Sequence, residues 1–192
     1  KARELGAHLV LIDESGLMMM PLVRRSLAPR GCTPVLRHKA SHRDRVSICA
    51  ALCLSPVRRR VSLHFQVLPG DYFHNERVAE FLRQLLRSLR GPVVVIWDRG
   101  NMHKGDPIRA VCRRFRRLHL EMLPPYAPEL NPVEHLWNHL KYTELANYVP
   151  QDVPQLHRKV TTLLNSVRNN PKRLSNFYDG SPINFKTPAL ET

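Results

Sequence analysis

Runs and alternations of apolar residues along the chain predict five strands. Residues 7–13 and 93–98 are short, almost continuously apolar runs that each end in aspartate, a pattern typical of strands buried on both faces. Residues 45–54 and 61–68 are predicted as two more strands, joined by a short turn rich in arginine. A fifth strand is predicted over residues 118–123. The first three strands therefore follow one another with only loops between them.

Helical periodicity begins after the third predicted strand. Over residues 75–90 apolar residues recur at spacings of three, four, seven and eight, which predicts an amphipathic helix with its arginines toward solvent. Similar patterns predict helices over residues 107–117 and 152–169, and a further helix from Pro132 to about residue 147. From residue 170 onward the chain is polar and contains prolines, and we expect this tail to be loosely held.

The order of these elements is strand, strand, strand, helix, strand, helix, strand, helix, helix. Such an order predicts an α/β fold, with a mixed five-stranded sheet flanked by helices. The length of 192 residues and the hydrophobic fraction of 43% suit one domain with a sizeable core. We therefore expect one domain over residues 1–170 and a C-terminal tail over residues 171–192.

The charge of the chain points to its partner. There are 30 Lys and Arg residues against 16 Asp and Glu, a formal net charge of +14. A compact domain with that excess of positive charge repels itself unless it binds a polyanion, so nucleic acid is the leading candidate for a partner. The alternative, that the protein is basic without binding any polyanion, stays open. No apolar run is long enough to span a bilayer and no signal-peptide pattern is present, so we expect a soluble intracellular protein.

Three carboxylates occur where functional groups gather in an open α/β sheet, beyond the strand ends. Asp13 and Asp98 each end an apolar run, and they would meet if those strands are parallel neighbours. Glu134 follows Asn131 by three residues at a helix start; a capping box is its ordinary alternative, as a turn or cap is for each aspartate. Together, three such oxygen ligands suit Mg²⁺ or Mn²⁺. Two ions about 3.5–4 Å apart would activate a water and stabilise a leaving oxygen.

Three blocks of sequence surround these acids: Ile12-Asp13-Glu14-Ser15, Trp97-Asp98-Arg99-Gly100-Asn101-Met102-His103-Lys104, and Leu123-Pro124-Pro125-Tyr126-Ala127-Pro128-Glu129-Leu130-Asn131-Pro132-Val133-Glu134. They resemble the three blocks of the DDE transposases, and most of all the bacterial insertion-sequence transposases of the mariner superfamily. The third block is the most specific. The resemblance covers the chain from about residue 7 to residue 170.

The resemblance implies a ribonuclease H-like fold in which Asp13, Asp98 and Glu134 form the catalytic, metal-binding triad. It implies Mg²⁺- or Mn²⁺-dependent cleavage at transposon ends, with two ions when DNA is bound. The freed 3′ hydroxyl would then attack target DNA, typically at a TA step, without a covalent enzyme–DNA intermediate. The implied partners are double-stranded DNA and a second copy of the chain in the active complex. The implied location is the bacterial cytoplasm at the nucleoid, with no membrane involved.

Several further residues are predicted to contact DNA. His103 matches a family histidine that could touch phosphate, orient a carboxylate or serve only the structure, and we place it with the DNA contacts. Asn138 and Lys141 follow Glu134 by four and seven residues, which predicts that they lie on the same helical face as Glu134. The full set is Arg99, His103, Lys104, Arg109, Asn138 and Lys141.

The chain departs from the family pattern at three points. Arg99 stands where relatives often have asparagine, and Leu27 stands where many have tryptophan. Relatives also carry helix-turn-helix modules ahead of the catalytic domain. This chain begins almost at the first catalytic strand, so we expect such a module to be absent. Two other functions stay open: a catalytically idle DNA-binding or assembly module, and a ribonuclease H-like nuclease acting on RNA–DNA hybrids or junctions.

Overall fold

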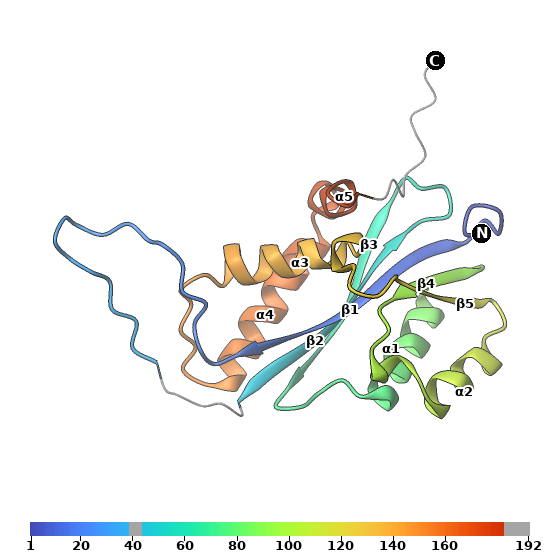
Figure 1. Cartoon of the computed structure of the whole chain (residues 1–192), viewed down its shortest axis with the longest axis horizontal. Helices are drawn as coiled ribbons and strands as arrows, with labels where there is room; N and C mark the ends of the chain where they lie inside the picture. Colours follow the sequence, from blue (N-terminus) through green and yellow to red (C-terminus); the bar gives the residue numbers. More distant parts are fainter. Residues whose placement is uncertain (39–43, 183–192) are drawn as a thin grey trace, which may run out of the picture.

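The computed structural model describes residues 1–38 and 44–182. Its five strands form one sheet in the order β3-β2-β1-β4-β5, shown in Figure 1. The first three strands are antiparallel neighbours, whereas β4 and β5 run parallel to β1. Their bounds are β1 (His8–Met18), β2 (Arg45–Leu54), β3 (Val61–Pro69), β4 (Val93–Trp97) and β5 (Leu118–Met122). The predicted mixed five-stranded sheet is confirmed.

Helices cover both faces of this sheet (Figure 1). One face packs against α1 (Asn75–Ser88) and α2 (Asp106–Arg114). The other packs against α3 (Val133–His139), α4 (Val153–Arg168) and α5 (Pro171–Asp179). Three short helical turns complete the set: η1 (Asn101–His103), η2 (Pro128–Leu130) and η3 (Leu140–Glu144). In residues 1–38 and 44–182, no helix is both long and apolar enough to cross a membrane.

The alternation of side chains along β1 separates the two cores. Leu9 and Leu11 are buried against the α3, α4 and α5 side, whereas Val10 and Ile12 are buried against the α1 and α2 side. Successive side chains of a strand point to opposite faces. The next two residues, Asp13 and Glu14, are therefore directed to different layers of the molecule.

β1 is longer than its apolar run predicts. It continues to Met18 because β2 pairs with it from Leu9, opposite Leu54, to Met18, opposite Arg45. Asp13 consequently lies inside the strand and not at its end. A run of apolar residues reports burial, and here the hydrogen-bonded ladder continues past the buried part.

The expectation of a loosely held tail after residue 170 is wrong for residues 171–179. They form α5, whose start is capped by the Asn170 side chain accepting from the Arg173 N–H at 3.0 Å. Leu174, Phe177 and Tyr178 are buried in the core, and the Tyr178 hydroxyl donates to the Leu52 carbonyl at 2.7 Å. Three apolar residues in so short a segment are too few to reveal a helix by periodicity. The rest of the predicted tail, residues 183–192, lies outside the described part of the chain.

The segment after β1 leaves the body of the protein as an extended excursion (Figure 1). Its base is tied down by Asn147, whose side-chain oxygen accepts from the Arg24 N–H at 2.8 Å and whose amide nitrogen donates to the Arg24 carbonyl at 3.1 Å. Farther out, Leu27 is fully exposed. This departure from the family pattern therefore affects a side chain that makes no contribution to the core.

Candidate active site

The first two acids lie at the same level of the sheet because β1 and β4 are parallel neighbours. The register pairs Leu11 with Ile96, and continuing it by two residues places Asp13 level with Asp98. β4 ends at Trp97, so Asp98 is the first residue beyond the strand. The parallel pairing of β1 and β4 that this expectation required is present, and it places the two residues at the same level of the sheet.

Asp13 is held on the α3 side of the sheet. The indole N–H of Trp137 donates to Asp13 Oδ2 at 2.6 Å. Burial is the largest influence and raises the pKa of Asp13 to about 7; the Trp137 hydrogen bond lowers it, and the charges of Glu14, Glu134 and Asp98 raise it further. The acid therefore sits among other negative charges, in a place where its ionised form is costly.

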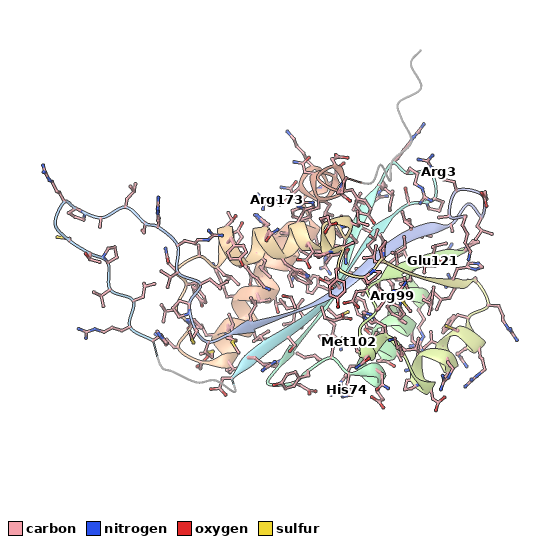
Figure 2. All side chains as sticks on the ribbon, in the orientation of Figure 1. Arg3, His74, Arg99, Met102, Glu121 and Arg173 are labelled. Carbon is pink, nitrogen blue, oxygen red and sulfur yellow. The ribbon has the colours of Figure 1, made fainter. Side chains whose placement is uncertain are left out.

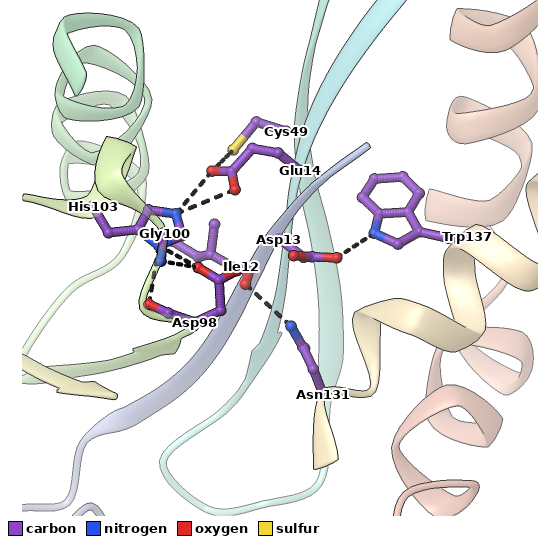
Figure 3. Close-up of polar contacts among 9 residues, drawn as sticks. All are labelled: Ile12, Asp13, Glu14, Cys49, Asp98, Gly100, His103, Asn131 and Trp137. Atoms are coloured by element: carbon purple, nitrogen blue, oxygen red, sulfur yellow. Dashed lines mark hydrogen bonds and ion pairs between the residues drawn. The ribbon is translucent and has the colours of Figure 1, made fainter. Parts of the chain in front are cut away.

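Asp98 is held from the opposite side. Its side chain is 59% exposed, and its Oδ1 accepts from the Gly100 N–H at 2.8 Å and faces His103 Nδ1 at 2.8 Å (Figure 3). The turn is tight, because a Cβ added at Gly100 would lie 2.9 Å from Asp98 Oδ1. Glycine at this position lets the backbone N–H approach the carboxylate.

Glu134 enters from the first turn of α3. The helix begins at Val133, and Asn131 links it to β1: its side-chain oxygen accepts from the Val133 N–H at 3.2 Å and its amide donates to the Ile12 carbonyl at 3.2 Å. The N–H of Asn131 donates to the Pro128 carbonyl at 2.8 Å. The capping-box alternative needs that N–H for Glu134, so the geometry favours a carboxylate directed elsewhere.

One cavity of about 410 Å³ collects the three predicted acids. It is lined by Asp13, Asp98, Arg99, Gly100, Leu123, Pro124, Pro125, Tyr126, Ala127, Pro128, Asn131 and Glu134. Within residues 1–38 and 44–182, however, no group of three or more His, Cys, Asp or Glu side chains is close enough together to hold one metal ion. The three acids share a cavity, and Asp13 and Asp98 are each held there by donors of their own.

Glu14 and the buried His103 form a pair on the other face of β1 (Figure 3). The ring of His103 has Nε2 at 3.2 Å from both oxygens of Glu14, and it stacks on Trp97 with centroids 4.3 Å apart. The residue is only 2% exposed. Burial lowers the pKa of His103, but the hydrogen bond to Glu14 and the charges of Glu14 and Asp98 outweigh it and raise the pKa overall.

The burial of His103 argues against its predicted contact with DNA. Both ring nitrogens already face acceptors inside the protein, so no donor remains for a phosphate. Of the roles left open by the sequence, the arrangement favours orienting a carboxylate. Sequence reasoning missed the partner residues Glu14 and Trp137. The only available signals were the alternation of β1 and a tryptophan one helical turn after Glu134.

The predicted basic contacts near Asp98 differ in how available they are. Arg99 lines the cavity, and its Nε donates to the Leu123 carbonyl at 3.4 Å; Figure 2 shows it near the middle of the molecule. Lys104 is exposed. Arg109 is exposed but paired with Asp106 at 2.7 Å. Arg99 is therefore the best placed of the three to meet a strand that enters the cavity.

The two predicted DNA contacts that follow Glu134, Asn138 and Lys141, lie in different elements. Asn138 is exposed on the helix itself. Lys141 lies in η3, a π-type turn, and lines a second cavity of about 290 Å³ with Met18 and Tyr142. A π-type turn pairs residues five apart, so the α-helical spacing that predicted a shared face with Glu134 does not apply there.

Comparisons with known proteins identify the family and the fold. The sequence matches the family described as DDE superfamily endonuclease over residues 8–157. No curated protein matches the sequence. Among solved structures, the Mos1 transposase paired-end complex with the left transposon end has a TM-score of 0.65 at 16% identity, covering 90% of this chain and 51% of that one.

Two further Mos1 mariner paired-end complexes match with the same coverage, 90% of this chain and 51% of the solved chain. The complex with Mn has a TM-score of 0.65 at 17% identity, and the complex with Mg has one of 0.63 at 18% identity. The chain thus spans about half the length of these solved chains. At such identities the likeness shows the fold, and the predicted ribonuclease H-like fold is confirmed. Because the family match extends over well more than half of its residues, the chain belongs to the DDE superfamily endonuclease family.

Proposed function

We propose that this chain is the catalytic domain of a DNA transposase, with Asp13, Asp98 and Glu134 as its catalytic triad. The observation that carries the proposal is that these acids, distant along the chain, line one cavity. They come from β1, the end of β4 and the start of α3, and the net charge of +14 supplies attraction for DNA. The catalytic domain extends through α5, because that helix is packed into the same core.

The donor set suits Mg²⁺ or Mn²⁺. All three side chains are carboxylates, the ligands that these hard cations prefer. In the described part of the chain, hydrogen bonds and ion pairs engage Oδ2 of Asp13 and Oδ1 of Asp98, so one oxygen of each remains for a cation. Burial and neighbouring acids raise the pKa of Asp13 to about 7. A bound cation would offset this unfavourable environment of the ionised carboxylate. When bound, such ions activate a water or hydroxyl and stabilise the departing oxygen of a phosphodiester.

The residues of the chain bind, orient and shield the reacting groups. Water attacks a phosphodiester at the transposon end, breaking the P–O3′ bond and freeing a 3′ hydroxyl. That hydroxyl then attacks a target phosphodiester, forming one P–O bond as another breaks, typically at a TA step. Arg99 sits in the cavity beside Asp98 and is placed to hold a phosphate. No side chain needs to bond covalently to DNA.

The partners follow from the same proposal. Double-stranded DNA supplies both the transposon end and the target, and two copies of the chain act together on two ends. The source is a bacterial insertion sequence of the mariner superfamily, and the protein acts in the cytoplasm at the nucleoid. Mn, Mg and a transposon end are named in the Mos1 structures of the same fold, which supports DNA as the partner and these metals as the ions.

Plasmid nicking tests the proposal. Supercoiled plasmid is incubated with the wild type, Asp98→Ala and the matched exposed-acid control Asp71→Asn, each with Mg²⁺, with Mn²⁺ and with EDTA. The wild type and Asp71→Asn should nick in either metal and not in EDTA, whereas Asp98→Ala should show no nicking while retaining the circular dichroism of a folded protein. Equal nicking by Asp98→Ala would contradict the proposed triad.

A catalytically idle DNA-binding module is the second candidate. One observation favours it: in the part of the chain that is described, no three acids are close enough to hold one ion. The same experiment separates the two functions. DNA binding without nicking by the wild type, in either metal, would assign the idle module.

A further inference from the structure

Asp98 is the only member of the proposed triad whose carboxylate faces a histidine in the described structure. His103 lies in η1, five residues after Asp98, and the chain turns back so that Nδ1 reaches Asp98 Oδ1 at 2.8 Å and the Asp98 carbonyl at 3.1 Å. The other ring nitrogen reaches across to β1, where Glu14 receives it (Figure 3). The ring therefore connects the loop after β4 to the neighbouring strand.

The surroundings of His103 fix the ring in one orientation. Its side chain has no exposed surface, and it lies nearly parallel to Trp97, at an interplanar angle of 7°. Both nitrogens face carboxylate oxygens, which accept hydrogen bonds and cannot donate them. The ring therefore spans the two carboxylates, with Nδ1 toward Asp98 and Nε2 toward Glu14.

The Glu14 side chain contacts the His103 ring and does not line the carboxylate cavity. It is 14% exposed in its side chain, points away from the Asp13 face of β1, and is absent from the lining of the carboxylate cavity. The Cys49 thiol donates to Glu14 Oε1 at 3.6 Å from the adjacent strand. Removing Glu14 would leave a buried N–H without an acceptor, which is more costly than losing an exposed hydrogen bond.

We propose that His103 and Glu14 are positioning residues that hold the Asp98 carboxylate for metal binding, Glu14 acting through the His103 ring. The inference rests on the proposed function, because it names the ion as the ligand of Asp98. His103 and the Gly100 N–H occupy Oδ1 of Asp98, which leaves the other oxygen for an ion in the cavity that Asp98 lines. Residues behind a metal ligand fix its orientation and commonly change metal affinity by about 10–100-fold.

Two amide substitutions separate positioning from packing. In His103→Asn the side-chain amide nitrogen lies near the place of Nδ1 and can still donate to Asp98. In His103→Gln it lies near the place of Nε2 and can reach only Glu14. Mn²⁺ binding to each purified protein is measured by the electron paramagnetic resonance signal of the free ion. We expect His103→Gln to weaken Mn²⁺ binding about 10-fold or more and His103→Asn to weaken it clearly less.

A second measurement needs neither metal nor activity. The Gly100 N–H donates to Asp98 Oδ1 at 2.8 Å, so its proton chemical shift in the metal-free protein reports where that carboxylate lies. The shift should stay near the wild-type value in His103→Asn and move in His103→Gln. Glu14→Gln should move it too, whereas the matched control Glu121→Gln on β5, which faces Lys1, should not.

The two measurements distinguish the possible failures. Equal effects of the two amides on the Gly100 shift, or a better retained shift in His103→Gln, would show that the ring only fills space and would overturn the positioning role. Failure of the wild type to bind Mn²⁺ or to nick DNA, with the Gly100 shifts as expected, would overturn the proposed function and leave the hold on Asp98 established. Loss of Mn²⁺ binding in Glu121→Gln would contradict the specificity of the pair.

Discussion

Asp13 and Asp98 are level with each other on neighbouring strands, yet their surroundings are opposite. Asp13 lies inside β1, mostly buried, and the described contacts give it one donor, the indole N–H of Trp137. Asp98 lies just beyond β4 with a side chain that is 59% exposed, and it faces two donors, the Gly100 N–H and His103. One acid is confined by the core on the α3 side, and the other is held by a loop on the α1 and α2 side.

The difference in burial between Asp13 and Asp98 explains how both acids can line one cavity without a bound cation. Burial near other carboxylates makes the ionised form of Asp13 costly, which is why its pKa is about 7. Asp98 is more exposed, and two donors already face it. A cation would therefore bring its largest electrostatic relief at Asp13, whereas the geometry of the site depends more on how Asp98 is held.

The largest expected effect is on cleavage, and it should be the same for both acids. Asp13→Asn and Asp98→Asn should each reduce plasmid nicking by more than about 100-fold, beyond the effect typical of residues behind a ligand. Their effects on stability should differ in sign. In EDTA at pH 8, Asp13→Asn removes a costly buried charge and should raise the free energy of unfolding, whereas Asp98→Asn weakens two hydrogen bonds and should lower it by about 1 kcal/mol. Urea unfolding measures both, and changes of the same sign would break the comparison.

The pH dependence of stability sharpens the comparison further. The pKa of Asp13 is raised from 3.8 to about 7 by folding, so the folded state binds a proton more tightly than the unfolded state. This contribution to stability is fully present below pH 3.8 and is lost as the pH rises through about 7, by a few kcal/mol in total. Urea unfolding of the metal-free wild type and Asp13→Asn from pH 4 to pH 8 should show the variant gaining relative stability as the pH rises. A constant difference across that range would contradict the assigned burial effect.

Disturbing the neighbours of each acid should have smaller and contrasting effects. Gly100→Ala would bring a Cβ to 2.9 Å from Asp98 Oδ1, so the carboxylate must move; Mn²⁺ binding should weaken about 10-fold with little change in stability. Trp137→Phe removes the donor to Asp13 from a buried ring and should also cost about 1–3 kcal/mol of stability. Calorimetric binding and urea unfolding of both variants test this. Equal stability losses would show that the two sides are supported alike.

Much of the fold could be predicted because buried residues recur at regular spacings along strands and helices. The apolar runs locate β2 and β3 almost to the residue, and they put each of the first two acids directly after an apolar run; the parallel pairing of their strands comes from the structure. The same alternation assigns Asp13 and Glu14 to opposite faces. Chain order and strand pattern were sufficient for these features because neighbouring strands bury neighbouring apolar residues.

The remaining features depend on contacts between distant segments. Nothing in the sequence pattern shows that Trp137 donates to Asp13 or that Glu14 receives His103 from 89 residues away. The buried apolar residues of α5 are too few for their helical spacing to be distinctive, and their burial depends on packing against distant segments. A π-type turn after α3 changes the face on which Lys141 lies. Local spacing cannot encode these effects, because each depends on a partner that the spacing does not include.

The smallest expected effect concerns which side of the cavity meets the DNA backbone. Arg99 lies on the Asp98 side and lines the cavity, whereas Arg83 on α1 is paired with Glu80 at 3.1 Å. If Arg99 neutralises one phosphate, Arg99→Gln should lower the slope of log affinity against log salt by about 0.9, and Arg83→Gln should leave it unchanged. Fluorescence anisotropy with a labelled duplex between 50 and about 200 mM salt measures the slopes. Equal slopes for Arg99→Gln and wild type would mean that the strand enters without touching the Asp98 side, because a phosphate contact cannot be lost without releasing fewer counterions.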